Sequence, residues 1–185
     1  SSVLALTHDG QLLIAKTGVT RWSIDGLPSP GWQNVGRPMV TACLVEQPDG
    51  RILAGGAEYP TGAPARQPLV RLQSDGTLDD GFAPNLGDPS GRTVQVNAIA
   101  FAGPDAILVG GAFTRAGEMP VTALVRLRSD GSVDPTFTAE LKNSGSVRAI
   151  ARYGDTNLLA GGSFLAVNDT AQPNLTAVSF DGSVN

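Results

Sequence analysis

The chain has 185 residues, of which 41% are hydrophobic, so it is long enough to bury a sizeable core in one domain or in a run of small repeating units. Its net charge of −4 and its lack of a basic run argue against a nucleic-acid partner, and no apolar stretch reaches the roughly 18–20 residues of a membrane span. The single cysteine, Cys43, excludes a disulfide framework within one chain.

One pattern recurs four times along the chain. A copy contains an apolar run, a turn, a second apolar run that usually ends in Gly-Gly, a variable stretch, a third run and an Asp-Gly turn. The four copies cover residues 3–32, 40–82, 96–137 and 147–185. A fixed period of about 50 residues predicts a repeat architecture.

The third copy shows the expected elements most clearly. Residues 96–101 and 106–109 are short apolar runs joined by a Pro-Asp turn, which predicts a β-hairpin. We expect Gly-Gly to end the second strand, residues 112–121 to form a variable loop, and residues 123–128 to form the third strand. A fourth, weakly marked strand is expected between residues 133 and 147.

Three or four short strands in each repeat are typical of a β-propeller blade. A β-solenoid is the second architecture that fits, although its coils usually use fewer residues. The first two strands of each repeat carry apolar residues on both faces, as expected where a sheet packs between two others. We therefore predict an all-β propeller with four blades of about 50–55 residues.

The residues also resemble a known family. The third copy ends in Ser132-Val133-Asp134-Pro135-Thr136-Phe137 after its Gly-Gly and Val-Arg-Leu segments, and this pattern is similar to the delta-60 repeat of bacterial β-propellers. The second copy keeps most of the pattern, the fourth has Gly161-Gly162-Ser163-Phe164, and the first has Ala15-Lys16 in place of Gly-Gly. The resemblance implies a larger ring, of seven or eight blades for example, in a large secreted or cell-surface protein. It supplies no catalytic residues.

The repeated glycines have two possible interpretations. The positions are Gly55, Gly56, Gly110, Gly111, Gly161 and Gly162. Glycine lets a ligand approach the backbone, but a β-bulge or a crowded inner strand explains a repeated glycine as well, and we favour that structural reading.

The Asp-Gly turns favour tight hairpins over calcium loops, because none has the alternating carboxylates of a calcium-binding loop. The densest acidic cluster, formed by Asp75, Asp79 and Asp80, keeps a calcium site open as an alternative.

An arginine and an aromatic residue also recur. The arginines are Arg21, Arg71 and Arg126, and the aromatic residues are Trp32, Phe82 and Phe137. Asp79 and Asp134 accompany the arginine in two copies, which favours a structural arginine–carboxylate pair over a site for an anionic substrate. The aromatic residues indicate packing between blades, with stacking on sugar rings as the alternative.

Catalytic combinations are scarce in the sequence. His8 is the only histidine, so Ser-His-Asp and multi-histidine metal sites lack members. Glycoside hydrolysis by a pair of carboxylates stays open as an alternative, because the sequence does not give the distance between two carboxylates in the fold.

The variable stretches between the second and third strands are the best candidates for a contact surface. Their candidate residues are Tyr59, Arg66, Arg115, Glu118, Asn168 and Asp169. We predict a non-enzymatic module that binds a protein or a glycan outside a bacterial cell; the alternatives are an architectural spacer and a carbohydrate-active enzyme. We expect no cofactor, and we expect the rest of a parent chain or a second copy to complete the ring; the alternative is that the four repeats close alone as a small ring. Residues 1–3 are no signal peptide, and a removed leader would leave no trace.

Overall fold

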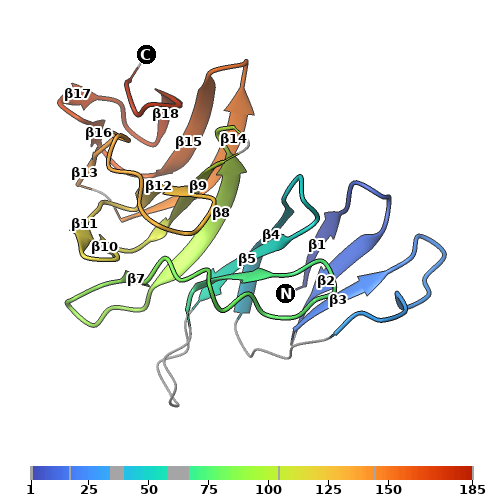
Figure 1. Cartoon of the computed structure of the whole chain (residues 1–185). Coiled ribbons are helices and arrows are strands. Elements are labelled where there is room, and N and C mark those ends of the chain that lie inside the picture. The colour runs from blue at the N-terminus through green and yellow to red at the C-terminus, as the bar shows by residue number, and fades with distance from the viewer. Residues whose placement is uncertain are drawn as a thin grey trace.

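The computed structural model describes residues 2–16, 18–33, 40–57, 67–103, 105–143 and 145–184. Every regular element within these residues is a β-strand (Figure 1). They contain no helix long and apolar enough to cross a membrane.

Each of the four repeats forms an antiparallel sheet of three main strands, with its second strand in the middle (Figure 1). The main strands are β1 (Val3–Leu6), β2 (Leu12–Ala15) and β3 (Val19–Trp22); β4 (Val40–Glu46), β5 (Ile52–Ala57) and β6 (Leu69–Leu72); β8 (Gln95–Phe101), β9 (Ala106–Ala112) and β12 (Leu124–Arg128); and β14 (Ser146–Tyr153), β15 (Asn157–Ser163) and β18 (Leu175–Ser179). We call these the first to fourth sheets. One pairing, Ala57 with Gln95, joins the second and third sheets at a corner.

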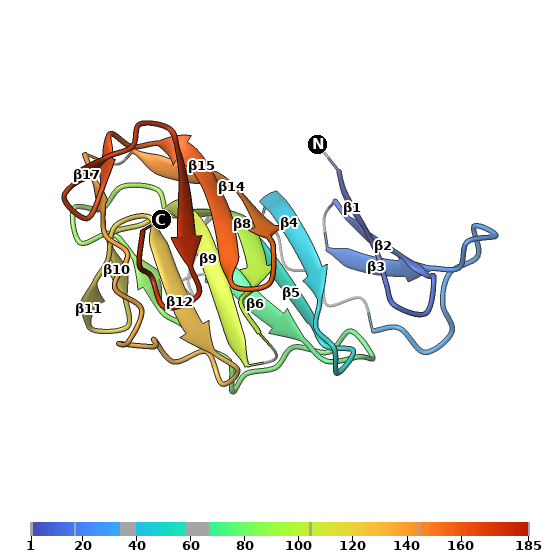
Figure 2. The same cartoon turned by 90° about the horizontal axis from the view of Figure 1, so that it is seen from above.

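The four sheets pack face to face in chain order (Figure 1), with the fourth lying over the third in the view from above (Figure 2), and the core lies between them. Three clusters of buried side chains fill the three junctions. In β5, Ile52 contributes to the junction with the first sheet, whereas Leu53 contributes to the junction with the third. Both are fully buried, because the side chains of a strand alternate between its two faces. The predicted all-β fold with propeller-type blades is confirmed.

The Gly-Gly pairs lie within strands and do not end them, which corrects that expectation. Gly55 and Gly56 belong to β5, and the partner strand β4 has a register shift between Thr41 and Cys43 opposite them. A Cβ on Gly56 would lie 2.1 Å from the carbonyl oxygen of Val40. The second glycine is therefore required by the close approach of a bulged neighbouring strand.

The two variable stretches that the structure describes form small hairpins, although we expected loops. In the third repeat, β10 (Arg115–Ala116) and β11 (Met119–Pro120) pair with each other, and β10 also pairs with β7 (Leu86–Gly87) from the preceding repeat. The fourth repeat has the same arrangement with β16 (Ala166–Val167), β17 (Thr170–Ala171) and β13 (Leu141–Lys142).

The expected fourth strand is reduced to two short pairings. Val133 makes an isolated bridge with Leu127 of the same repeat, and β13 pairs with a hairpin of the next repeat. The tail of one repeat therefore ties it to its successor.

The second Asp-Gly turn has the same geometry in three repeats. In the turn at Asp75, Gly76 has a φ of +88°, and the Asp75 carboxylate accepts hydrogen bonds from the N–H and hydroxyl of Thr77. The turns at Asp130 and Asp181 use a serine in the same way. These carboxylates stabilise the turns by local hydrogen bonds.

Candidate functional site

The two small hairpins lie along one side of the molecule and carry four of the six predicted contact residues (Figure 1). Arg115 is exposed on β10, with its Nη2 3.1 Å from where a Cβ on Gly87 would lie. Glu118 and Asp169 are exposed at the tips of the hairpins β10–β11 and β16–β17. Tyr59 and Arg66 lie outside the described residues.

Asn168 uses its polar groups within the fold. It has a φ of +52°, its N–H donates to the carbonyl of Glu140 at 2.7 Å, and its Oδ1 accepts from the N–H of Glu140 at 2.9 Å. Gly117 occupies the same hairpin position in the third repeat, with a φ of +55°. Asn168 therefore shapes the hairpin turn, because asparagine tolerates this left-handed conformation.

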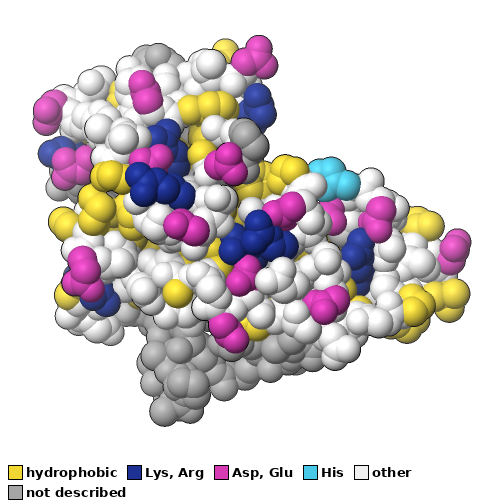
Figure 3. All heavy atoms as spheres, viewed as in Figure 1, with side chains coloured by type: hydrophobic (Ala, Val, Ile, Leu, Met, Phe, Trp, Pro, Cys, Tyr) yellow, Lys and Arg dark blue, Asp and Glu magenta, His cyan; other side chains and the backbone are white. Residues whose placement is uncertain are grey.

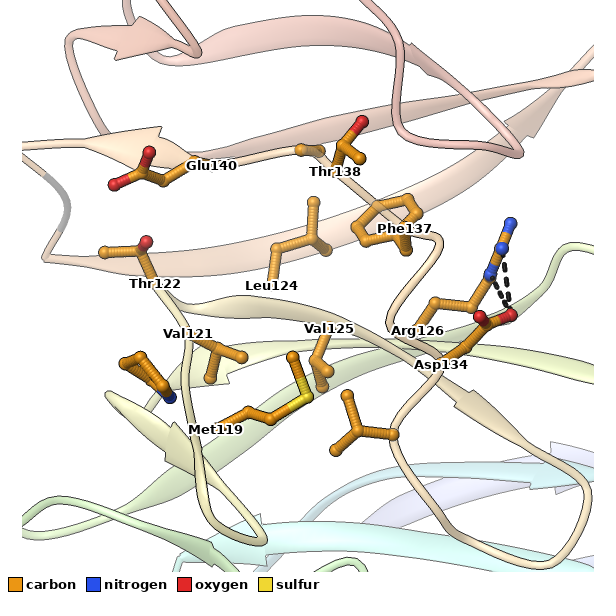
Figure 4. Close-up of a pocket in the computed structure, with 13 residues that line it drawn as sticks. Met119, Val121, Thr122, Leu124, Val125, Arg126, Asp134, Phe137, Thr138 and Glu140 are labelled. Carbon is orange, nitrogen blue, oxygen red and sulfur yellow. Dashed lines mark hydrogen bonds and ion pairs between the residues drawn. The ribbon is translucent and has the colours of Figure 1, made fainter.

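A cavity of about 500 Å³ lies beside the hairpin β10–β11 (Figure 4). The hairpin, strand β12 and the segment from Phe137 to Glu140 surround it. Its lining residues are Met119, Pro120, Val121, Thr122, Leu124, Val125, Arg126, Val133, Asp134, Phe137, Thr138, Ala139 and Glu140. Most are apolar, whereas Thr138 and Glu140 are exposed at the rim. The sequence did not indicate this cavity, because its walls come from three separate segments.

Strand β12 borders the cavity with an edge that is only partly paired. It is the outermost strand of the third sheet, and Asp134 and Ser132 make backbone hydrogen bonds to this edge at Arg126 and Arg128. Gly111 donates to Ala123 on the inner side, so the alternation of an antiparallel ladder turns the N–H and C=O of Leu124 outward. Within the described residues, no backbone hydrogen bond is made to Leu124 from this side.

Arg126 and Asp134 form the polar wall of the cavity (Figure 4). Arg126 Nε and Nη2 lie 3.0 and 2.9 Å from Asp134 Oδ2, and the guanidinium stacks on Phe137 at 5.5 Å from the ring centroid. The Thr136 N–H and hydroxyl and the nearby Arg126 lower the pKa of Asp134. Arg126 also donates through Nη1 to the carbonyl of Phe180 in the next repeat. Its donors are thus used within the fold: Nε and Nη2 bind Asp134 of the same repeat, and Nη1 joins this repeat to the next.

The second repeat has the same arrangement. Arg71 Nε donates to Asp79 Oδ2 at 2.8 Å, Nη1 donates to the carbonyl of Ser129 in the third repeat, and the guanidinium lies 4.5 Å from the centroid of Phe82. The pairing between the repeated arginine and aspartate is therefore present in both repeats that contain the acid.

The first repeat has Ser29 in place of that aspartate. Arg21 instead reaches Asp9 Oδ2 at 2.7 Å and stacks at 5.9 Å from the Trp32 ring centroid. Its buried Nε has no hydrogen-bond partner among the residues that the structure describes. The arginine is retained where the carboxylate is not, which fits its contact with the carbonyl of Ser74 in the second repeat at 3.4 Å.

The acidic cluster weighed for calcium does not gather around one point. Asp79 binds Arg71, whereas Asp75 bonds to Thr77 within its own turn. Asp80 lies in the following turn. The described part of the chain has no group of three or more His, Cys, Asp or Glu side chains that could hold a metal ion. His8 Nδ1 lies 2.6 Å from Glu46 Oε2, so the single histidine links the first two repeats.

A second cavity of about 500 Å³ lies where the first strands of three repeats begin. Ala42, Asn97 and Arg148 line it and occupy equivalent positions in their repeats. Asn97 donates through Nδ2 to the carbonyl of Val147 at 2.8 Å, which leaves less of its polar surface for a ligand.

Four stacked sheets of this kind define a β-propeller protein. Residues 47–82 and 105–137 match the model of a family described as "Domain of unknown function (DUF5122) beta-propeller". The search of curated proteins finds no match. Among solved structures, the chain is similar to a crystal structure described as a "putative gluconolactonase", with 15% identity, coverage of 93% of this chain and 71% of that chain, and a TM-score of 0.31.

Proposed function

We propose that the chain is a non-catalytic binding module, built from repeats of the delta-60 type, that holds an extended segment of a protein partner against strand β12. The observation that carries this proposal is the cavity of about 500 Å³ beside a partly unpaired strand edge. An extended peptide can add to such an edge through main-chain hydrogen bonds, while a neighbouring pocket selects its side chains.

The lining of the cavity favours an apolar side chain of a protein. Met119 and Val121 offer thioether and aliphatic surface, and the guanidinium of Arg126 covers one side of the Phe137 ring. A sugar ring would need an open aromatic face for stacking. In Figure 3, hydrophobic side chains gather on the side where β10, β11 and β12 lie, with acidic and basic side chains around them.

The setting that we propose is a bacterial secreted or cell-surface protein, in which the module serves adhesion. The resemblance to the delta-60 repeat supports this setting. A spacer is the simplest alternative, and it predicts that no ligand binds this side of the molecule.

A peptide library displayed on phage tests the proposal. We expect the chain to enrich extended peptides with an apolar residue, and Met119→Glu to weaken their binding roughly 10-fold or more, because the new carboxylate lies at the apolar cavity. Met119 is 40% exposed, so this change leaves the fold intact.

Leu165→Glu is the matched control, because Leu165 is an exposed residue of the neighbouring hairpin region and does not line the cavity. A glycan array and a broad hydrolase screen run on the same protein. Glycan binding without peptide enrichment, or turnover that is lost when one carboxylate is replaced, would refute the proposal.

A further inference from the structure

The junctions between successive repeats share one construction. The face of each inner sheet that points to the next repeat carries a leucine from the middle strand and a leucine from the outer strand. In the second sheet these are Leu53 and Leu69, both 0% exposed. A Cβ on Gly55 would lie 2.5 Å from Cγ1 of Val96, so a valine of the next repeat fills the space above this glycine.

The fourth sheet has the same face, and no part of the chain that the structure describes packs against it. Leu175 occupies the position of Leu69 and Leu124, yet it is 60% exposed, whereas they are 0% and 2% exposed. A Cβ on Gly161 would meet nothing closer than 3.7 Å, in contrast to Gly55. Strand pairing puts these further side chains on the free face: Ala149, Ala151, Tyr153, Leu159 and Ala177.

The first sheet has the opposite kind of face, which the described residues leave uncovered. Leu4 and Leu6 are each 67% exposed, and strand pairing puts Leu12, Ile14 and Trp22 on the same face. In the second sheet, the residues that correspond to the last three are Ile52, Ala54 and Leu72. Those residues are buried in the junction with the first sheet. This free face of the first sheet is therefore of the type that receives a preceding repeat.

We propose that the free face of the fourth sheet binds the free face of the first sheet in a second copy of this chain. The contact continues the construction of the three inner junctions, and the first and fourth sheets lie at opposite ends of the stack (Figure 1). A head-to-tail contact of this kind either closes into a ring or extends as a filament. Two chains of four sheets give a ring of eight, which lies within the typical range of four to eight propeller blades, so the assembly is a closed dimer.

The junction between chains rests on apolar contact. Ala177 occupies the position of Arg71 and Arg126, so this junction lacks the arginine that donates to a carbonyl of the next repeat. We therefore expect the dimer to persist in about 0.5 M NaCl, because salt screens charges and does not weaken apolar burial.

Analytical ultracentrifugation of the 185-residue chain over a range of concentrations tests this proposal. We expect a reversible dimer, and we expect Leu4→Glu and Leu175→Glu each to weaken it roughly 100-fold or more, because a carboxylate replaces a leucine in an apolar junction. Leu165→Glu, which changes an exposed leucine outside both faces, leaves the dimer unchanged. Circular dichroism checks that each variant is folded.

A mixture of the two variants distinguishes head-to-tail contact from other geometries. A Leu4→Glu chain keeps an intact fourth sheet, and a Leu175→Glu chain keeps an intact first sheet. One intact junction can therefore form between the two variants, and we expect the mixture to dimerise where neither variant does alone. Failure of the mixture to dimerise refutes the head-to-tail geometry. The chain could instead stay monomeric at all concentrations and be stabilised when a copy of residues 135–185 is appended to it. That result would show that a linked repeat covers this face, and it would refute the proposal that a second copy of the chain binds there.

Discussion

Substitution of one repeated glycine by alanine tests the packing between repeats. A Cβ on Gly110 would lie 2.5 Å from Cγ1 and 2.9 Å from Cβ of Val147, and 2.9 Å from Cδ1 of Ile150. Separations below 3 Å require the fourth sheet to shift. The same substitution at Gly161 meets no atom within 3.7 Å, so it is a control at an equivalent position of another repeat.

The magnitude follows from two opposing effects. Overpacking of a filled core typically costs about 1–3 kcal/mol. Alanine in place of glycine within a strand contributes about 0.5–1 kcal/mol of stability. We therefore expect Gly110→Ala to lower the free energy of unfolding by about 1–2 kcal/mol and Gly161→Ala to raise it by about 0.5–1 kcal/mol.

Thermal unfolding followed by circular dichroism measures the difference. Both glycine substitutions are best made in the monomeric Leu175→Glu variant, so that association between chains does not contribute to the Tm. For a chain of this size, a separation of about 2 kcal/mol corresponds to Tm values that differ by roughly 4–8 °C. Equal Tm values for Gly110→Ala and Gly161→Ala would show that the repeated glycine is not required by contact with the next sheet.

Three further predictions concern the arginine contacts, acid stability and the cysteine. Arg71→Ala should lower the free energy of unfolding by about 3 kcal/mol and Arg21→Ala by about 1 kcal/mol, because only Arg71 is buried with a carboxylate. Urea unfolding measures both losses, and equal losses would contradict this prediction. The folded-state pKa of Asp134 is lowered, so the stability it contributes is present above its unfolded pKa of about 3.9 and is lost as pH falls through the folded value. The stability difference between the protein and Asp134→Asn should therefore shrink on acidification, and a difference that is constant with pH would count against it. Burial raises the pKa of Cys43 to about 12. The folded protein should therefore react slowly with a thiol reagent at pH 8, whereas the urea-unfolded protein should react rapidly. Equal rates would exclude a protected thiol.

The repeat and the strands within it could be predicted from the amino-acid sequence alone. Apolar runs such as residues 106–109 and turns such as Asp130-Gly131 are local patterns, and a strand or a tight turn is stabilised largely by neighbouring residues. Apolar residues on both faces of the strands predicted sheets packed between sheets, and the recurrence of Arg71 with Asp79 predicted their pairing. These features could be predicted because each lies within one repeat and occurs more than once.

The contacts that join the repeats and the position of the cavity could not be predicted from the sequence, because they depend on the packed fold. The carbonyl that accepts a hydrogen bond from Arg126 belongs to Phe180, and β10 pairs with β7 of the preceding repeat. Backbone groups of this kind are present at every residue, so no residue type marks them in the sequence. The cavity beside β12 likewise depends on segments that meet only after the sheets have stacked, and the free energy of that stacking comes from apolar contacts between distant parts of the chain.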